Sequence, residues 1–287
     1  MCETVNSTIH CKRPREARLG GTTESVRPDW VDDDLFPFDS HFIDIAGHTV
    51  HYVDEGSGPT LLLLHGNPTW SFLWREVIKD LRADFRCIAM DLPGFGLSTA
   101  RTGYSYLPEQ HAEVVAEFVD ALDLSWVTLV GQDWGGPIGV AAAQRRPDAF
   151  GRLVLANTWA WPVNGILHFE AFSRIMGGPP ARFLVRHLNL LVNTFIATGH
   201  RRRRPTAAEM EHYRRAQDTA QRRQASAVLP GRIRRSIPTY VASRSWSTPA
   251  SSTPTTPSSR MNSPPRSVRW GLARANCADV MTFRNTF

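Results

Sequence analysis

The sequence predicts an α/β protein with a mostly parallel central sheet and a helical cap that follows the sheet-forming segments. Up to about residue 157, short apolar runs alternate with stretches of helical periodicity, which is typical of β–α–β units. From residue 159 the chain is rich in aromatic residues and helix formers and lacks strand alternation. Of the 287 residues, 42% are hydrophobic and 21% are charged, which is the composition of a soluble globular protein with a sizeable core.

The strands of the sheet are expected in a regular series. Residues 41–56 contain two alternating runs separated by the turn residues Gly47 and His48, a pattern that predicts a β-hairpin. The following strands are predicted by short apolar runs, which suit a sheet that is covered on both faces. These runs occupy residues 60–64, 85–90, 126–130 and 153–156.

Helices are expected between these strands and in the cap. Apolar spacing predicts them at residues 70–82, 107–122, 136–144 and 206–224. Pro108 falls in the first turn of its helix, where the missing N–H has no cost. Thr206 and Glu209 form a capping box at the start of the last helix. Four aromatic residues are expected in the space between sheet and cap, namely Trp159, Trp161, Phe169 and Phe172.

The segment Gly131–Gly135 (GQDWG) has the glycine–x–nucleophile–x–glycine form and lies between an expected strand and an expected helix. Small flanking residues permit a tight turn, the nucleophile elbow, which presents one side chain above the carboxyl edge of the sheet. The presented residue is Asp133. A carboxylate cannot act there as serine does, but it can displace a leaving group from an sp³ carbon and form an ester. An ordinary aspartate in a strand–helix turn is the structural alternative.

A second motif, HGNPTW, occupies residues 65–70 directly after an expected strand. In this architecture the loop in that place supplies a backbone N–H that faces the nucleophile. Asn67 adds an amide donor, and Trp134 adds an indole N–H that cannot accept a hydrogen bond. Two neutral donors beside a carboxylate nucleophile suit a departing halide. A tight turn and a packed aromatic ring are the structural alternatives for these two residues.

With these motifs the chain resembles the haloalkane dehalogenases of the α/β-hydrolase fold, from about residue 30 to about residue 235. Further segments that carry the resemblance are YVDEGSGP, DLPGFGLS, NTWAWP and EMEHYRR. The resemblance implies Asp133 as the nucleophile, Asn67 and Trp134 as the halide-binding pair, and a cap over the site. It implies a halogenated alkane as substrate, halide and water as the other small partners, and no metal or organic cofactor. Two alternatives stay open: an epoxide hydrolase, whose relatives carry another residue in place of Asn67 and need cap tyrosines, and a non-catalytic remnant.

The resemblance also implies two catalytic groups that the sequence does not show. A histidine near the C-terminus should activate water, and a carboxylate should orient that histidine. Asn157 and Thr158 stand after the last expected core strand, where one branch of the family has its acid. The last histidine of the chain is His212, inside the expected helix 206–224. Glu209 and Glu211 of the same helix are expected on a solvated face.

Four segments are therefore expected along the chain. They are an extension without apolar periodicity, expected to be disordered (1–28), an α/β-hydrolase core (29–158), a helical cap (159–235) and a low-complexity tail (236–287). Residues 241–287 contain nine Ser, six Thr, five Pro and six Arg, and no strand or helix is expected there. The C-terminal strands of the fold are thus missing from the sequence. The arginine-rich composition favours a shifted reading frame over natural disorder.

The charge distribution narrows the choice of partners. The net charge is +6, but residues 1–199 carry −7 and residues 200–287 carry +13. No recognition motif accompanies the run Arg201–Arg204, so no nucleic-acid partner is predicted. No stretch is apolar enough for a membrane span, so no membrane partner is expected. Four widely spaced cysteines, and first residues without the apolar core of a secretory signal, favour the cytoplasm. The oligomeric state stays open, with a monomer preferred.

Overall fold

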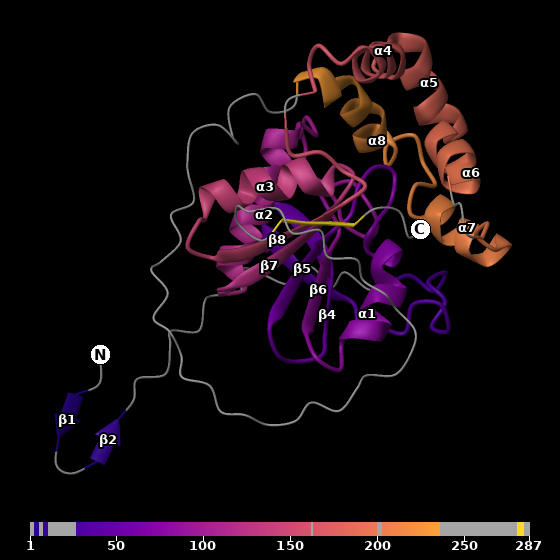
Figure 1. Cartoon of the computed structure of the whole chain (residues 1–287). Coiled ribbons are helices and arrows are strands. Elements are labelled where there is room, and N and C mark those ends of the chain that lie inside the picture. The colour runs from indigo at the N-terminus through magenta and orange to yellow at the C-terminus, as the bar shows by residue number, and fades with distance from the viewer. Residues whose placement is uncertain are drawn as a thin grey trace, which may run out of the picture.

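The computed structural model describes residues 27–161, 163–199 and 203–235, together with short strands at 3–5, 8–10 and 280–283. The strands of the central sheet are β3 (His41–Ile45), β4 (His48–Glu55), β5 (Thr60–Leu64), β6 (Arg86–Met90), β7 (Val127–Gln132), β8 (Phe150–Ala156) and β9 (Val280–Phe283). Their order is β3-β4-β6-β5-β7-β8-β9 (Figure 1). The hairpin β3–β4 joins β6 in antiparallel pairing, and the pairs from β6 through β9 are parallel. The mostly parallel sheet is therefore confirmed.

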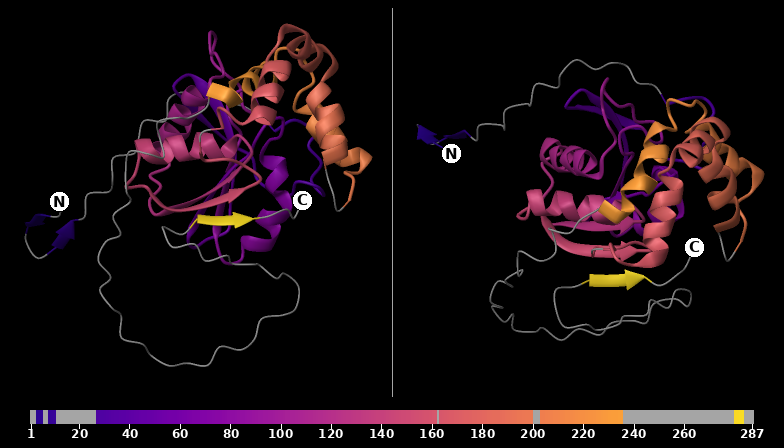
Figure 2. Two further views of the ribbon diagram at one scale, coloured as in Figure 1. Left: turned by 45° about the horizontal axis from the view of Figure 1, so that its top comes forward. Right: turned by 90° about the horizontal axis from the view of Figure 1, so that it is seen from above.

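Helices cover both faces of the sheet because its inner strands bury alternate side chains on opposite faces. Leu62 and Leu64 belong to the apolar core beneath α2 (Pro108–Ala121) and α3 (Gly135–Arg145). Leu61 and Leu63 belong to a second core, which includes side chains of the short helix η1 (Ser71–Trp74) and of α1 (Arg75–Leu81). Figure 2 shows α2 and α3 side by side on their face of the sheet. The parallel pairing of β5 with β7 places their carboxyl ends side by side.

Several boundaries differ from the sequence prediction. The turn of the first hairpin consists of Ala46 and Gly47, not Gly47 and His48, because both central residues have positive φ, as a two-residue hairpin turn requires. The helix expected at 206–224 ends at Arg215, and a second helix starts only at Gln224.

Three short strands lie in segments where the sequence predicts none. β1 (Glu3–Val5) and β2 (Thr8–His10) pair in a separate antiparallel sheet. β9 pairs in parallel with β8 and extends the central sheet by one strand. All three runs contain β-branched or large apolar residues, which favour extended structure. The expectations for the rest of the N-terminal extension and for residues 236–279 and 284–287 lie outside the described residues.

Arg27, close to the expected boundary of 28/29, is bonded to the loop that follows it. The Arg27 guanidinium donates hydrogen bonds to the backbone carbonyls of Phe38, Val31 and Phe36, and it also pairs with Asp33. These bonds close the loop that leads into β3.

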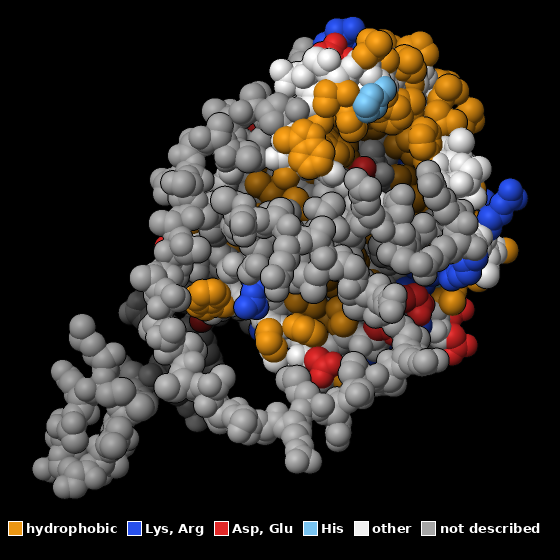
Figure 3. Space-filling model, in the orientation of Figure 1, with side chains coloured by type: hydrophobic (Ala, Val, Ile, Leu, Met, Phe, Trp, Pro, Cys, Tyr) orange, Lys and Arg blue, Asp and Glu red, His pale blue; other side chains and the backbone are white. Residues whose placement is uncertain are grey.

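The cap is a set of helices along one side of the sheet, as Figure 1 and Figure 2 show. They are α4 (Leu167–Met176), α5 (Pro179–Leu188), the π-helical turn η2 (Leu191–Ile196), α6 (Ala197–Gly199), α7 (Ala207–Arg215), α8 (Gln224–Val228) and η3 (Leu229–Arg235). Large apolar side chains of α4 and α5 remain exposed, among them Leu167, Ile175, Phe183 and Leu188. In Figure 3 apolar side chains gather over this upper part of the molecule.

Candidate active site

Asp133 occupies the tip of a tight turn between β7 and α3. Its φ of 49° lies in the left-handed region, which is unfavourable for most residues and is tolerated only where the surroundings enforce it. The surroundings do so from two residues after β8: the Asp133 N–H donates to the carbonyl of Asn157 (3.3 Å), and the Thr158 hydroxyl donates to the Asp133 carbonyl (2.5 Å). The predicted elbow is therefore present as a strained, tightly held turn.

Two glycines make this turn possible by allowing close approach. A Cβ on Gly66 would lie 2.3 Å from the Cβ of Asp133, and a Cβ on Gly135 would lie 2.1 Å from the carbonyl oxygen of Leu64. Neither gap can hold a side chain. The two loops of the site, HGNP after β5 and GQDWG after β7, thus touch each other through glycine.

Backbone donors hold the Asp133 carboxylate. The Asn67 N–H lies 2.8 Å from Oδ1, and the N–H of Trp134 also donates to the carboxylate. The side chain keeps partial solvent access, yet burial raises the pKa of Asp133 to about 6, against the opposing effect of these two N–H groups. At pH 7 and above the group is mostly an anion that is only partly solvated, which suits a nucleophile.

Asn67 and Trp134, the other two predicted site residues, lie beside Asp133. The Asn67 amide donates from Nδ2 to the carbonyl of Ser226 in α8 (3.3 Å), which brings the cap down onto the HGNP loop. Trp134 is buried at the start of α3. Its ring packs edge to face against the ring of Trp159, with the two ring centroids 5.1 Å apart. The structure therefore brings all three predicted residues into one site at the carboxyl edge of the sheet.

The aromatic residues expected between sheet and cap divide into two groups. Trp159 is buried against Trp134, and Phe169 is half-buried beside Trp159 at 6.4 Å. Trp161 is 53% exposed and Phe172 is 36% exposed, so these two side chains are not buried between sheet and cap.

His65 is close to the nucleophile, but both nitrogens of its ring form hydrogen bonds to backbone groups. Its Nδ1–H donates to the carbonyl of Gly66 (2.9 Å), and its Nε2 accepts from the N–H of Leu92 (3.0 Å). Burial lowers the pKa of His65, so the ring is neutral and both nitrogens are in use. Within the described ranges, the carboxylate of Asp133 receives its hydrogen bonds from backbone N–H groups and from no histidine.

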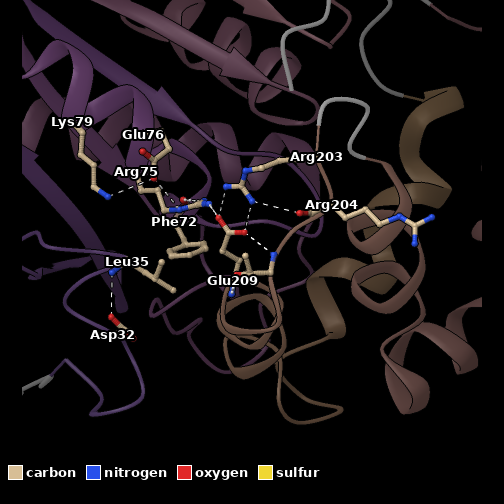
Figure 4. Close-up of polar contacts among 10 residues, drawn as sticks. Asp32, Leu35, Phe72, Arg75, Glu76, Lys79, Arg203, Arg204 and Glu209 are labelled. Atoms are coloured by element: carbon tan, nitrogen blue, oxygen red, sulfur yellow. Dashed lines mark hydrogen bonds and ion pairs between the residues drawn. The ribbon is translucent and has the colours of Figure 1, made fainter.

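Glu209 is not on a solvated face, contrary to the sequence expectation. Its carboxylate is buried, and it bonds to Arg75 of α1 and to both terminal nitrogens of Arg203 at 2.7 Å each (Figure 4). The Arg203 hydrogen bonds, partly offset by burial, hold the pKa of Glu209 well below its usual value. Helix periodicity alone could not show this, because the burying surface belongs to η1 and α1 of the core. Glu211 is exposed, as expected.

His212 is likewise a structural residue. Its ring stacks on Phe72 at 4.6 Å, its Nδ1–H donates to the carbonyl of Ala208, and its Nε2 accepts from the N–H of Asp32. With Glu209 it fixes α7 on the core, and neither residue reaches Asp133.

Other chemistry-bearing groupings lie away from the elbow. A cleft of about 390 Å³ opens on the cap between α5, η2 and α7, lined by polar groups such as His187, Asn193 and Arg214. It does not include Asp133. Among the residues that the structure describes, no cluster of His, Cys, Asp and Glu could hold a metal ion. Over the same residues, no helix has both the length and the apolar character needed to cross a bilayer.

Comparison with known proteins agrees with this geometry. The chain matches the family described as alpha/beta hydrolase fold over residues 59–255. It is 46% identical to Haloalkane dehalogenase 2 of Mycobacterium bovis over 202 residues, which are 70% of each protein. It is also 39% identical over 132 residues to a cis-3-alkyl-4-alkyloxetan-2-one decarboxylase of Shewanella oneidensis, which covers only 45% of this chain and 42% of the relative.

Solved structures give the same result. The crystal structure of a haloalkane dehalogenase from Bradyrhizobium elkani superposes with a TM-score of 0.62 at 27% sequence identity, covering 69% of this chain and 70% of the other. Fold, sequence and the aspartate at the elbow thus agree, and the chain belongs to the haloalkane dehalogenases, the α/β-hydrolases that act on carbon–halide bonds.

Proposed function

We propose that this chain displaces halide from haloalkanes through an aspartyl ester, with Asp133 as the nucleophile. One observation carries the proposal: the Asp133 carboxylate stands at the tip of the elbow with Oδ1 held 2.8 Å from the Asn67 N–H. Family membership supports the carbon–halogen bond as the bond that is broken.

In the first step, the carboxylate oxygen that the Asn67 N–H does not hold attacks the carbon that bears the halogen. An oxygen–carbon bond forms, and the carbon–halogen bond breaks with its electron pair on the departing halide. The side-chain amide of Asn67 and the indole N–H of Trp134 donate to that halide. These neutral donors stabilise the developing charge without forming an ion pair that would retain the product.

In the second step, water attacks the carbonyl carbon of the ester, and the bond between that carbon and the alkyl oxygen breaks. The alcohol leaves with one proton of the water, and the other proton is released as the Asp133 carboxylate forms again. The backbone N–H groups of Asn67 and Trp134 stabilise the oxyanion of this step. Removing general-base assistance typically slows such a step by about 10²–10⁴-fold, and among the described residues no side chain is placed to provide it. We therefore expect the alkyl-enzyme to accumulate and turnover to be defective.

Intact mass spectrometry after incubation of the full chain with 1-bromobutane tests both steps. The proposal expects one butyl group per chain, and Asp133→Ala should abolish it. Absence of both the adduct and bromide release with the unaltered chain would refute Asp133 as nucleophile. Release of many equivalents of bromide per chain would refute the stalled second step and would show that a base acts from outside the described residues.

The epoxide hydrolase alternative is less well supported. Tyr213 of α7 is a tyrosine of the cap, but it is buried against Phe72 and the Arg75 guanidinium, away from the elbow. Asn67 supplies an amide suited to halide. Formation of a diol from an epoxide, without halide release from bromoalkanes, would favour this alternative.

The remaining assignments belong to the same proposal. The substrate is a halogenated alkane, with water as the second reactant, and the chemistry described requires neither metal nor organic cofactor. A cytoplasmic location is proposed from the cysteine content, four residues widely spaced along the chain.

A further inference from the structure

Two buried polar residues of the cap, Gln217 and Ser226, form a closed ring of hydrogen bonds with the HGNP loop. Gln217 is 1% exposed and Ser226 is fully buried. The Gln217 Nε2 donates to the carbonyl of Pro68 (2.7 Å), and the Ser226 hydroxyl donates to Gln217 Oε1 (2.9 Å). The Asn67 Nδ2 donates to the carbonyl of Ser226 (3.3 Å). The covalent bond between Asn67 and Pro68 closes the ring.

The ring fixes the orientation of both amides. A backbone carbonyl can only accept, so the atom of the Gln217 amide that faces Pro68 must be the nitrogen. Its oxygen then faces the Ser226 hydroxyl, which must donate. By the same argument, the Ser226 carbonyl requires the nitrogen of the Asn67 amide. A primary amide nitrogen carries two hydrogens, so one remains after this bond for a leaving group beside Asp133.

The Gln217 backbone is held as firmly as its side chain. Its carbonyl accepts from Arg223 Nε (2.7 Å) and from Asn189 Nδ2 (3.4 Å). The carbonyl therefore accepts from side chains and not from the backbone N–H that it would bind if α7 continued. The predicted helix 206–224 is interrupted at this point, and the Gln217 side chain lies toward the loop.

We propose that Gln217 is a positioning residue that sets the Asn67 amide for halide binding, acting through Pro68 and Ser226. The inference rests on the proposed role of Asn67 in halide departure. Gln217 touches neither substrate nor halide. It fixes the loop on one side of Asn67 and, through Ser226, the acceptor that orients the Asn67 amide. Misplacement of a donor by about 1 Å can cost up to 10²-fold in rate.

The leaving group provides a readout that a purely structural role would not change. Chloride leaves carbon less readily than bromide, so the transition state of a chloroalkane depends more on halide donors. A misplaced Asn67 amide should therefore slow reaction with chloroalkanes more than with bromoalkanes. A general loss of packing should slow both reactions by the same factor.

The experiment measures the rate of adduct formation on the full chain with 1-chlorobutane and with 1-bromobutane, by intact mass. Gln217→Met keeps the shape and removes the hydrogen bonds, and Gln217→Glu keeps the acceptor for Ser226 while removing the donor to Pro68. In both variants we expect the chloride rate to fall about 30-fold and the bromide rate about threefold. Gln221→Met is the matched control, because Gln221 is exposed in the same segment. It should leave both rates unchanged.

Ser226→Ala provides a milder variant if the Gln217 variants fold poorly. It removes the hydroxyl that orients Gln217 Oε1 but keeps the backbone carbonyl that binds Asn67. The ratio of bromide to chloride rates should rise about threefold. An unchanged ratio in the folded variants would overturn the positioning role while leaving the proposed function intact. Absence of both adduct and halide release with the unaltered chain would overturn both.

Discussion

The Thr158 hydroxyl donates a hydrogen bond to the backbone carbonyl of Asp133 at 2.5 Å, and it thereby helps to hold a residue whose φ is 49°. The bond runs from the end of β8 to the tip of the elbow after β7. Residues at the ends of two adjacent parallel strands therefore together hold the nucleophile in a strained conformation.

Thr158→Val tests this relationship because it keeps the β-branched shape and removes the donor. We expect a loss of about 1 kcal/mol in the free energy of unfolding and about a tenfold slower formation of the butyl adduct. Thr198→Val is the matched control, since the Thr198 hydroxyl bonds only to the carbonyl one turn earlier in an exposed helix. Equal adduct rates in the two variants would show that Thr158 does not support the elbow.

The rate of adduct formation should depend on pH through Asp133. Burial raises the pKa of Asp133 to about 6, and only the ionised carboxylate attacks carbon. The rate should therefore rise with pH, reach half its maximum near pH 6 and level off above pH 7. Below pH 5 it should fall about tenfold for each pH unit. Initial rates of butylation measured by intact mass across this range check the prediction, and a flat profile down to pH 4.5 would contradict it.

Asp133→Asn should abolish adduct formation and stabilise the fold at neutral pH. The pKa of Asp133 is raised in the folded state, so ionisation between about pH 4 and pH 6 costs stability, and the full cost is present above pH 6. Removing the charge should raise the free energy of unfolding by about 2 kcal/mol at pH 7.5. Thermal unfolding at pH 7.5 and at pH 3.5 is the measurement. The two proteins should differ at the higher pH and coincide at the lower one.

Glu209→Gln should destabilise the attachment of the cap to the core. The buried Arg75 would keep its charge and lose its carboxylate, which typically costs about 3–5 kcal/mol. Glu211→Gln is the control in the same helix, because it removes only the exposed ion pair of Glu211 with Arg215. It should change the free energy of unfolding by no more than about 0.5 kcal/mol. The pKa of Glu209 is depressed in the folded state, so its contribution is present above pH 4.5 and is lost as pH falls. Urea unfolding at pH 7 should separate the two variants, and their difference should narrow below pH 4.5.

The sequence alone predicted the elements whose structure is determined by residues close together in the chain. Apolar runs predicted β5, β6, β7 and β8, and the glycine pattern around Asp133 predicted the elbow, because both signals lie within a few consecutive residues. The same holds for Asn67 and Trp134, which flank the nucleophile once β5 and β7 are neighbours. The capping box of Thr206 and Glu209 is also present as predicted.

Only the tertiary structure decided what depends on contacts between distant segments. Helix periodicity predicted Glu209 as a surface carboxylate. In the structure Glu209 forms a buried ion pair with Arg75, which lies 134 residues earlier in the chain. Gln217 lies inside the predicted helix 206–224, but in the structure its side chain donates to the carbonyl of Pro68, 149 residues earlier in the chain. Hydrogen bonds and desolvation depend on which surfaces meet in space, and that information is not contained in the pattern of neighbouring residues.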